Sequence, residues 1–251
     1  MITGVSGQLG QELTNEAINC GAKVIGLDQS QEEMEMVAKL HNWEKENILL
    51  QKTDIRKKKD VEKAFTNGIN HFGKVTSQIN NSGVSVFENW PERSEESFDL
   101  VTDVNLKGTF FCMQVFMKYC IKSKTVGSIV NIASHYGIIS PDPRIYTDCA
   151  RRNSEVYGAT KAGVIQMSRY FSAHLAKEGI RVNTIAPGVM ATPLMLTAPQ
   201  NVQDGIVANI PFPQRLGEPS EFGQLVGHIV ENSYLNGETI RLDGGVRMQP
   251  R

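Results

Sequence analysis

The apolar positions of the chain form short continuous runs, which alternate with longer stretches whose apolar residues recur at helical spacing. Continuous apolar runs are typical of strands buried on both faces of a parallel sheet. Strands are predicted at residues 23–28, 47–54, 75–83, 127–134, 180–188 and 238–245. Helices are predicted near residues 8–20, 60–72, 95–122, 157–178 and 219–232.

Alternating strands and helices indicate a parallel sheet, because parallel neighbours need a crossover connection and usually make it through a helix. Right-handed crossovers then place helices on both faces. We therefore predict an α/β fold, a Rossmann-like, doubly wound, mostly parallel seven-stranded sheet with helices on both faces. No repeat, low-complexity segment or linker divides the chain, so residues 1–251 are predicted to form a single domain.

Two stretches fit this fold less well. Only Met1 and Ile2 precede Thr3, so the first strand, which is central in such a sheet, is expected to be truncated. Either the native chain begins upstream or the strand itself is short. Residues 76–78 are all polar, yet they fall in a strand predicted to be buried on both faces. A buried polar group without a partner costs roughly 1–3 kcal/mol.

The bulk composition argues against several function classes. A net charge of −1 gives no basis for a nucleic-acid surface, and the basic run at 56–59 is interpreted as a solvated helix start. No apolar stretch is as long as a membrane span, which needs about 18 residues. The N-terminus lacks a signal-peptide pattern. The cysteines are scattered without CxxC spacing. This predicts reduced thiols, no metal site and a cytoplasmic protein.

The segment TGVSGQLG, residues 3–10, places Gly4, Gly7 and Gly10 between a strand end and a helix start. Residues without a Cβ allow a tight turn and a close approach to a pyrophosphate. The N-terminus of the following helix offers free N–H groups to the phosphates. An ordinary glycine-rich turn is the alternative interpretation.

The next predicted strand ends at Asp28, where a carboxylate is placed to accept hydrogen bonds from the adenosine ribose hydroxyls. Strand, glycine loop, helix, strand and acid together predict a dinucleotide site. Residues 29–36 contain no Arg or Lys, which favours NAD over NADP, because Asp28 would repel a 2′-phosphate. Asp54, which ends the following strand, is a further candidate facing the adenine edge.

Tyr157 and Lys161 lie one helical turn apart and share one face of a predicted helix. A free phenol has a pKa of about 10 and is a poor acid–base at neutral pH. An ammonium group about 4 Å away would lower that pKa by about three units, to near 7. The spacing alone fits a solvated helix lysine as well, so the assignment depends on context.

Further motifs follow one another along the chain, and they supply that context. They are the loop at 3–10, Asp54, NNSG at 80–83, DVNLKGTF at 103–110, SIVNIAS at 128–134, YGATK at 157–161, RVNTIAPG at 181–188 and LDGG at 242–245. In these motifs and their order the chain resembles the short-chain dehydrogenase/reductase family over nearly its whole length. The resemblance implies an NAD-dependent oxidoreductase that interconverts a secondary alcohol and a ketone. It also implies a homotetramer or homodimer, built through helices 105–122 and 157–178 and the C-terminal strand.

The resemblance assigns four catalytic roles. Asn105 matches the asparagine that bends its helix and holds a water in a proton relay, and Ser134 matches the serine that hydrogen-bonds the substrate oxygen. Tyr157 matches the general acid–base. Lys161 matches the lysine that lowers the tyrosine pKa and binds the nicotinamide ribose. In alcohol oxidation, Tyr157 takes the hydroxyl proton while the nicotinamide takes the hydride.

The cofactor contacts implied by the resemblance extend beyond the glycine loop. They are Gly4, Gly7, Gln8, Leu9, Gly10, Asp28, Asp54, Ile55, Asn81, Ser82, Gly83, Tyr157, Lys161, Pro187, Gly188 and Thr192. The glycine spacing departs from the common short form and is more similar to the extended, sugar-nucleotide-modifying branch. A sugar-nucleotide epimerase or dehydratase is therefore one alternative, although the C-terminal half is short for that branch. A non-catalytic NAD-binding scaffold is another, against which the complete catalytic set argues.

The substrate is the least determined part of the prediction. The interval from Ser134 to Tyr157 is longer than usual in the family, and the extra residues fall at 141–156. Candidate substrate contacts are His135, Arg144, Arg151 and Arg152. The loop resembles bacterial oxidoreductases of surface-sugar or flagellin-glycan pathways, whereas residues 210–250 resemble the 3-hydroxyacyl-CoA and hydroxysteroid dehydrogenases. Since the loop lies nearer the substrate, a polar, sugar-like secondary alcohol is the main prediction and a hydroxyacyl-CoA or hydroxysteroid the alternative.

Overall fold

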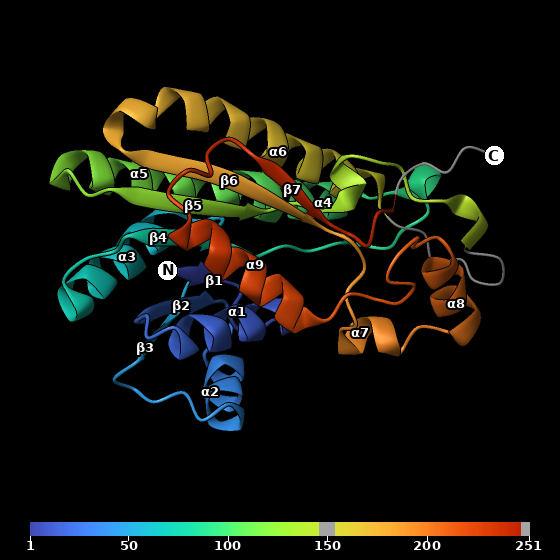
Figure 1. Ribbon diagram of the computed structural model, residues 1–251, viewed down its shortest axis with the longest axis horizontal. Coiled ribbons are helices and arrows are strands. Elements are labelled where there is room, and N and C mark those ends of the chain that lie inside the picture. Colours follow the sequence, from blue (N-terminus) through green and yellow to red (C-terminus); the bar gives the residue numbers. More distant parts are fainter. Residues whose placement is uncertain (146–153, 247–251) are drawn as a thin grey trace.

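A single parallel sheet forms the centre of the computed structural model, which describes residues 1–145 and 154–246 (Figure 1). Its strand order is β3-β2-β1-β4-β5-β6-β7, in seven strands. They are β1 Ile2–Thr3, β2 Val24–Asp28, β3 Ile48–Lys52, β4 Ser77–Asn80, β5 Gly127–Ile132, β6 Ile180–Pro187 and β7 Thr239–Leu242. The order reverses between β1 and β4, which creates a crevice at the carboxyl ends of these strands. The predicted fold class is confirmed.

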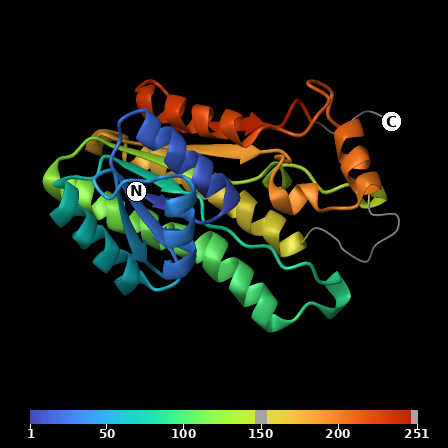
Figure 2. The same ribbon diagram turned by 90° about the horizontal axis from the view of Figure 1, so that it is seen from below.

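Helices cover both faces of the sheet (Figure 2). They are α1 Gln8–Asn19, α2 Gln31–Leu40, α3 Lys58–Phe72, α4 Glu95–Thr102, α5 Thr109–Ser123, α6 Glu155–His174, α7 Pro193–Leu196, α8 Gln200–Ala208 and α9 Pro219–Glu231. Helices α1, α2 and α9 pack on one face and α3, α5 and α6 on the other. Helices α7 and α8 follow β6 and lie beyond its carboxyl end (Figure 1).

Strand β5 shows how the two faces divide the core. Ile129 points into the cluster that holds Phe65 of α3 and Phe116 of α5, whereas Val130 points into the cluster with Phe222 of α9. Alternate residues of a strand face opposite sides. A strand buried in this way favours apolar residues on both faces, which is why the apolar runs of the sequence are nearly continuous.

The central strand β1 is as short as the sequence predicts, with two residues. Ile2 pairs with Gly26 of β2 on one side and with Ile79 of β4 on the other. The Met1 amino group donates to the Ser77 carbonyl at 2.7 Å, and burial lowers its pKa to about 5.

The polar residues of β4 are accommodated by a buried chain of amide hydrogen bonds. Gln78 Nε2 donates to Asn80 Oδ1 (2.7 Å), and Asn80 Nδ2 donates to Asn131 Oδ1 of β5 (2.7 Å). Asn131 Nδ2 then donates to Ser168 Oγ of α6 (2.8 Å), which donates to the Val164 carbonyl (2.8 Å). The partners of these groups lie on the neighbouring strand and helix, so the stretch at 76–78 alone does not reveal them.

Several helical predictions differ from the structure. Helices α2, α7 and α8 were not predicted; along α2 only Met34 and Val37 are buried. The stretch 95–122 is not one helix but α4, a π-helical turn at Asp103–Gly108, and α5. The helix predicted at 157–178 begins two residues earlier and ends at His174, before a 3₁₀ turn at Ala176–Glu178.

None of the described helices is both long and apolar enough to cross a membrane. No group of three or more His, Cys, Asp or Glu side chains within residues 1–145 and 154–246 is arranged to hold a metal ion.

Candidate active site

The loops that follow β1 to β4 enclose a cleft of about 470 Å³ at the point where the strand order reverses. Its lining comprises Gly4, Ser6, Gly7, Asp28, Gln29, Ser30, Glu33, Thr53, Ile55, Asn81, Ser82, Gly83, Val84 and Val104. The cleft is therefore built from residues that lie up to a hundred positions apart and meet only because their strands are parallel.

The glycine loop turns sharply between β1 and α1. Gly4 has a φ of +72°, which favours glycine, and its N–H donates to the Leu27 carbonyl at 2.7 Å. A Cβ at Gly10 would lie 1.9 Å from the Gly4 carbonyl oxygen, so α1 can approach the loop only because residue 10 is glycine. Gly7 precedes the first turn of α1, where Gln8 and Leu9 present backbone N–H groups without intrahelical acceptors. The irregular glycine spacing is compatible with a phosphate cradle.

Asp28 closes the other side of this cradle. Its Oδ2 accepts from the Ser6 N–H (3.0 Å), and its Oδ1 accepts from the Gln29 N–H (2.7 Å). The Ser6 hydroxyl is buried and has no hydrogen-bond partner among the described residues. A buried hydroxyl in this position is available to a ligand in the cleft.

The loop after β4 is fastened to the glycine loop. The N–H groups of Asn81 and Ser82 both donate to Thr3 Oγ1 at 3.0 Å, and Asn81 Nδ2 donates to the Thr3 and Gly4 carbonyls. Gly83 follows, and a Cβ there would lie 3.1 Å from Lys161 Nζ. These bonds fix the floor of the cleft.

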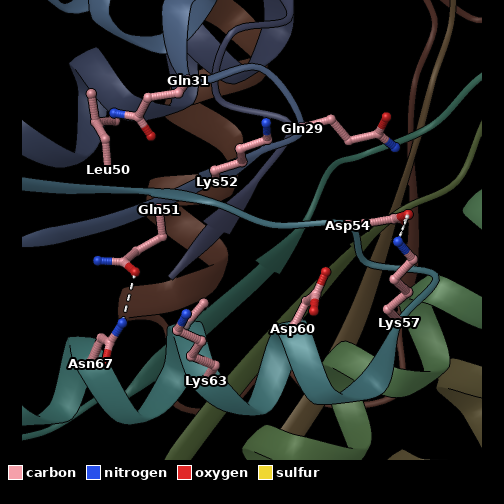
Figure 3. A pocket seen from close by; sticks show the side chains of 11 residues that line it. Gln29, Gln31, Leu50, Gln51, Lys52, Asp54, Lys57, Asp60, Lys63 and Asn67 are labelled. Carbon is pink, nitrogen blue, oxygen red and sulfur yellow. Dashed lines mark hydrogen bonds and ion pairs between the residues drawn. The ribbon is translucent and has the colours of Figure 1, made fainter.

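Asp54 lies outside this constellation. Arg56 binds its carboxylate through two side-chain N–H groups (2.9 and 2.8 Å), and these hydrogen bonds are the main reason why its pKa is lowered. Its side chain lines a neighbouring polar cavity of about 670 Å³ between β3 and α3, where Lys57 faces it (Figure 3). The cleft itself is lined by Thr53 and Ile55 on either side. Asp54 therefore lines the adjoining cavity, which shares Gln29 with the cleft.

Asn105 lies in the π-helical turn between α4 and α5, as the predicted bend requires. Its Oδ1 accepts from the Val84 N–H (2.8 Å), and its Nδ2 donates to the Val84 carbonyl (2.9 Å) and to Thr160 Oγ1 of α6 (3.2 Å). Because π-helical turns redirect a helix locally, this asparagine can reach both the β4 loop and α6.

Ser134, Tyr157 and Lys161 converge at the end of β5. Ser134 follows that strand, and Tyr157 lies in the first turn of α6, whose N-cap is Ser154. Lys161 lies one turn further along α6, is 3% exposed and donates from Nζ to the Ile132 carbonyl at 2.8 Å. Its Nζ is 5.5 Å from the centroid of the Tyr157 ring. The four predicted catalytic side chains therefore border the same crevice as the dinucleotide cleft.

Burial controls the protonation of this pair in the protein alone. Burial raises the pKa of Tyr157, and a hydrogen bond with Ser134 acts in the opposite direction. Burial also lowers the pKa of Lys161 to about 8. The expectation of a Tyr157 pKa near 7 is therefore wrong for the protein without ligand. The physical reason is that desolvation disfavours both charged forms, while the ammonium group is directed at the Ile132 carbonyl.

The segment after β6 packs closely against the end of the chain. Pro187 ends β6, and a Cβ at Gly188 would lie 2.8 Å from Asp243 Cα and 3.4 Å from His135 Nδ1. His135 is 4% exposed, and burial lowers its pKa to about 4. It is thus a neutral, packed side chain behind Ser134. Thr192 stands at the start of α7.

Arg144 is exposed and already paired. Its Nε and Nη2 both donate to the Asp142 carboxylate, at 2.9 and 2.5 Å. An arginine neutralised by a neighbouring carboxylate binds a substrate anion less strongly. Arg151 and Arg152 lie outside the described residues.

Comparisons with known proteins agree with this geometry. A family model described as Enoyl-(Acyl carrier protein) reductase matches residues 4–247. The "3-hydroxyacyl-CoA dehydrogenase type-2" of Bos taurus is 33% identical over 256 residues, which cover 100% of this chain and 95% of that protein. The crystal structure of a short chain dehydrogenase from Leptospira borgpetersenii with bound NAD+ has a TM-score of 0.86 and 30% identity, covering 98% of this chain and 91% of that one.

The chain belongs to the short-chain dehydrogenase/reductase family. It is an oxidoreductase of the class whose members act on CH–OH donors. A further structure of this family, "ElxO with NADP Bound", has a TM-score of 0.88 and 25% identity, covering 99% of this chain and 98% of that one. Family members of similar structure thus hold NAD+ or NADP.

Sequence reasoning about this short-chain dehydrogenase missed Arg93, which lies between β4 and α4. Its side chain is 6% exposed and donates to Ser97 Oγ (3.2 Å) and to the Val86 and Glu88 carbonyls (3.4 and 3.3 Å). It also forms a close ion pair with Glu155 in the first turn of α6. Arg93 therefore connects the β4–α4 segment to the helix that carries Tyr157. A lone arginine in a loop gives no sequence signal for this role.

Proposed function

We propose that this protein is an NAD-dependent oxidoreductase that interconverts a secondary alcohol and a ketone. One observation carries the proposal: Asn105, Ser134, Tyr157 and Lys161 meet at the carboxyl ends of the strands, beside a cleft built from the glycine loop and Asp28. Hydride transfer needs an acid–base group and a dinucleotide in one crevice.

The residues of the cleft fit a dinucleotide. Gly10 lies so close to Gly4 that a Cβ at residue 10 would not fit there. The Ser6 hydroxyl is buried without a partner among the described residues. Asp28 would accept from the ribose hydroxyls. The Gln29, Ser30 and Glu33 side chains that continue the lining carry no positive charge for a 2′-phosphate, which supports NAD over NADP.

The side chains then have distinct tasks. Ser134 and Tyr157 hold the substrate oxygen at the position where charge develops. Tyr157 takes the alcohol proton in oxidation and returns it in reduction. Lys161 stabilises the phenolate and binds ribose hydroxyls, and Asn105 orients the β4 loop and α6 around them. Bound NAD supplies the hydride acceptor.

The contacts of Lys161 bear on this assignment. Its Nζ donates to the Ile132 carbonyl, and burial raises the Tyr157 pKa. A positively charged nicotinamide near the phenol would favour the phenolate. We therefore expect the Tyr157 pKa to fall when oxidised cofactor binds.

We propose a 3-hydroxyacyl thioester as the substrate to test first. One support is the Bos taurus relative named 3-hydroxyacyl-CoA dehydrogenase type-2, which aligns with the whole chain. The other is the pairing of Arg144 with Asp142, which removes one expected contact for a polar ligand. The polar, sugar-like alcohol stays a prediction, as do the homotetramer or homodimer and the cytoplasmic location.

The deciding experiment is a screen for NAD reduction with 3-hydroxyacyl-CoA thioesters, hydroxysteroids, sugars and sugar phosphates, read from the absorbance of the reduced nicotinamide. Tyr157→Phe is the negative control. Turnover of the thioesters alone supports this substrate class, and turnover of sugars alone overturns it. A protein that binds NADH but oxidises no alcohol would be a non-catalytic scaffold, and one that regenerates NAD without net reduction would be an epimerase or dehydratase.

A further inference from the structure

A continuous chain of side-chain hydrogen bonds runs from the segment after α2 to the loop that enters α1. Trp43 Nε1 donates to Asn15 Oδ1 (2.7 Å), and Asn15 Nδ2 contacts His41 Nδ1 (3.2 Å). His41 Nε2 in turn contacts Gln11 Oε1 (2.9 Å), and Gln11 Nε2 donates to the Ser6 carbonyl (2.8 Å). We name these four side chains the α1–α2 relay.

Only one assignment of donors satisfies the whole relay. An indole N–H can only donate, so the oxygen of Asn15 must face Trp43. The amide nitrogen of Asn15 then donates to His41 Nδ1, which therefore carries no proton. His41 Nε2 carries the proton instead and donates to Gln11 Oε1. The relay thus requires a neutral imidazole in a single tautomer.

One end of the relay is anchored in the core. Trp43 is 8% exposed and packs in the same cluster as Met34 and Val37 of α2. The His41 ring stacks on the Trp43 ring, with centroids 5.5 Å apart and an angle of 18° between the planes. The imidazole is therefore fixed by packing as well as by its hydrogen bonds.

The other end of the relay reaches the dinucleotide cleft. Ser6 lines that cleft, and its peptide groups are held on both sides. Its carbonyl accepts from Gln11, and its N–H donates to the Asp28 carboxylate at 3.0 Å. The position of the glycine loop next to Asp28 thus depends on Gln11 from one direction and on Asp28 from the other.

We propose that Gln11, Asn15 and His41 are positioning residues for dinucleotide binding. They transmit the rigidity of the α2 core to the Ser6 peptide, so the glycine loop is held in its binding shape before the ligand arrives. Preorganisation of this kind raises affinity because less order is lost on binding. The inference rests on the proposed function only in requiring that the cleft binds a nicotinamide dinucleotide.

The test measures the Kd of NADH by titration calorimetry for wild type, His41→Phe and Gln11→Met. His41→Phe keeps the ring against Trp43 and removes both nitrogens, and Gln11→Met keeps the side-chain length. We expect each variant to raise Kd about three- to tenfold, the range of one lost hydrogen bond. The matched control is His71→Phe in the last turn of α3, where the ring also contacts an aromatic neighbour, Phe72 (4.5 Å), and Kd should stay within about twofold.

Two further readouts separate positioning from a merely structural role. Because His41 and Gln11 act in one relay, the double variant should raise Kd no more than either single variant. Asn15→Asp should retain wild-type affinity, since the carboxylate can accept from Trp43 and from a doubly protonated His41 that still donates to Gln11. Asn15→Leu should raise Kd as His41→Phe does.

The outcomes are decisive in either direction. Unchanged Kd in both single variants, or a lowered thermal midpoint at unchanged Kd, overturns the inference and leaves the proposed function intact. Additive effects in the double variant also overturn it. Wild-type protein that binds no NADH overturns the proposed function together with this inference. Should His41→Phe fail to fold, Gln11→Met on the half-buried surface of α1 carries the test.

Discussion

At the scale of single residues, burial and hydrogen bonding decide which titratable groups can act. Lys161 is buried and Tyr157 half-buried, and desolvation moves the pKa of each towards its neutral form. A positive charge added to the crevice by a bound ligand would favour the phenolate of Tyr157. Their side chains lie on one face of α6, as the spacing predicts, but the direction of Lys161 towards the Ile132 carbonyl required the structure.

Tyr157→Phe tests the acid–base assignment. Loss of the phenol removes the proton acceptor while leaving the glycine loop and Asp28 untouched. We expect turnover to fall at least about a hundredfold while the Kd of NADH stays within about twofold of wild type. Turnover is measured by steady-state kinetics and Kd by calorimetry. A variant that keeps more than about a tenth of the wild-type rate would refute the role of Tyr157.

His135 should make the fold sensitive to acid. Burial lowers its folded pKa from 6.5 to about 4, so the unfolded chain binds an extra proton in this interval. Stability therefore falls as the pH drops through this window, by about 3 kcal/mol at 1.36 kcal/mol per pKa unit. Urea unfolding of wild type and His135→Leu between about pH 7 and pH 4 measures the effect. The stability difference between the two proteins should shift by this amount in favour of His135→Leu, and a difference independent of pH would contradict the prediction.

At the scale of elements, the sequence predicts most strands and helices of the sheet but not the connections made through side chains. Continuous apolar runs mark β2, β5 and β6 because these strands are buried on both faces. Helix α2 was not predicted, because it buries only Met34 and Val37. Its N-cap Ser30, which accepts from the Glu33 N–H, was the available sequence signal. The resemblance predicts a bend at Asn105 but not its form, because local sequence spacing does not distinguish the π-helical turn at Asp103–Gly108 from a continuous helix.

Gly10→Ala tests the close approach of α1 to the glycine loop. A Cβ at this position would lie 1.9 Å from the Gly4 carbonyl oxygen, so helix or loop must shift and the phosphate cradle with it. We expect the Kd of NADH to rise at least about tenfold. Gly227→Ala in α9 is the control: its Cβ would be no closer than 3.8 Å to a neighbour, and alanine there should leave Kd unchanged and stabilise the helix slightly. Equal Kd values for wild type and Gly10→Ala would contradict the role of the contact.

Asn131→Leu tests the buried amide chain between β4, β5 and α6. The substitution removes the acceptor of Asn80 and the donor to Ser168 and leaves their polar groups buried. We expect a loss of about 2–4 kcal/mol in the free energy of unfolding, measured by urea denaturation. Asn67→Leu removes the hydrogen bond from the Asn67 amide to Gln51 at the rim of the polar cavity (Figure 3). This loss should cost less than about 1 kcal/mol. Similar losses in the two variants would mean that the buried chain adds nothing beyond ordinary packing.

At the scale of the whole molecule, function follows from strand order. The predicted parallel order places Gly4, Asp28, Gly83 and Ser134 at one edge, although they are distant in the sequence. The alternating strands and helices, together with the motifs, are enough to predict this arrangement from the sequence. The α1–α2 relay and the Arg93–Glu155 pair cannot be predicted in this way, because each joins segments whose contacts depend on how the loops pack.

The predicted homotetramer or homodimer, built through helices 105–122 and 157–178 and the C-terminal strand, also concerns the whole molecule; the two helices correspond to α5 and α6. Tyr170 of α6 is 54% exposed and stacks on His174, and Ile121 of α5 is 45% exposed, so apolar side chains face outwards on both helices. Burying them between two copies would be favourable, whereas a charge at this position would oppose it. We expect Tyr170→Glu to lower the molar mass measured by light scattering. Met36 is 64% exposed on α2, the helix beside the edge strand β3 (Figure 1), and Met36→Glu should leave the molar mass unchanged. A wild-type monomer, or an assembly that tolerates Tyr170→Glu, would move the interface away from these helices.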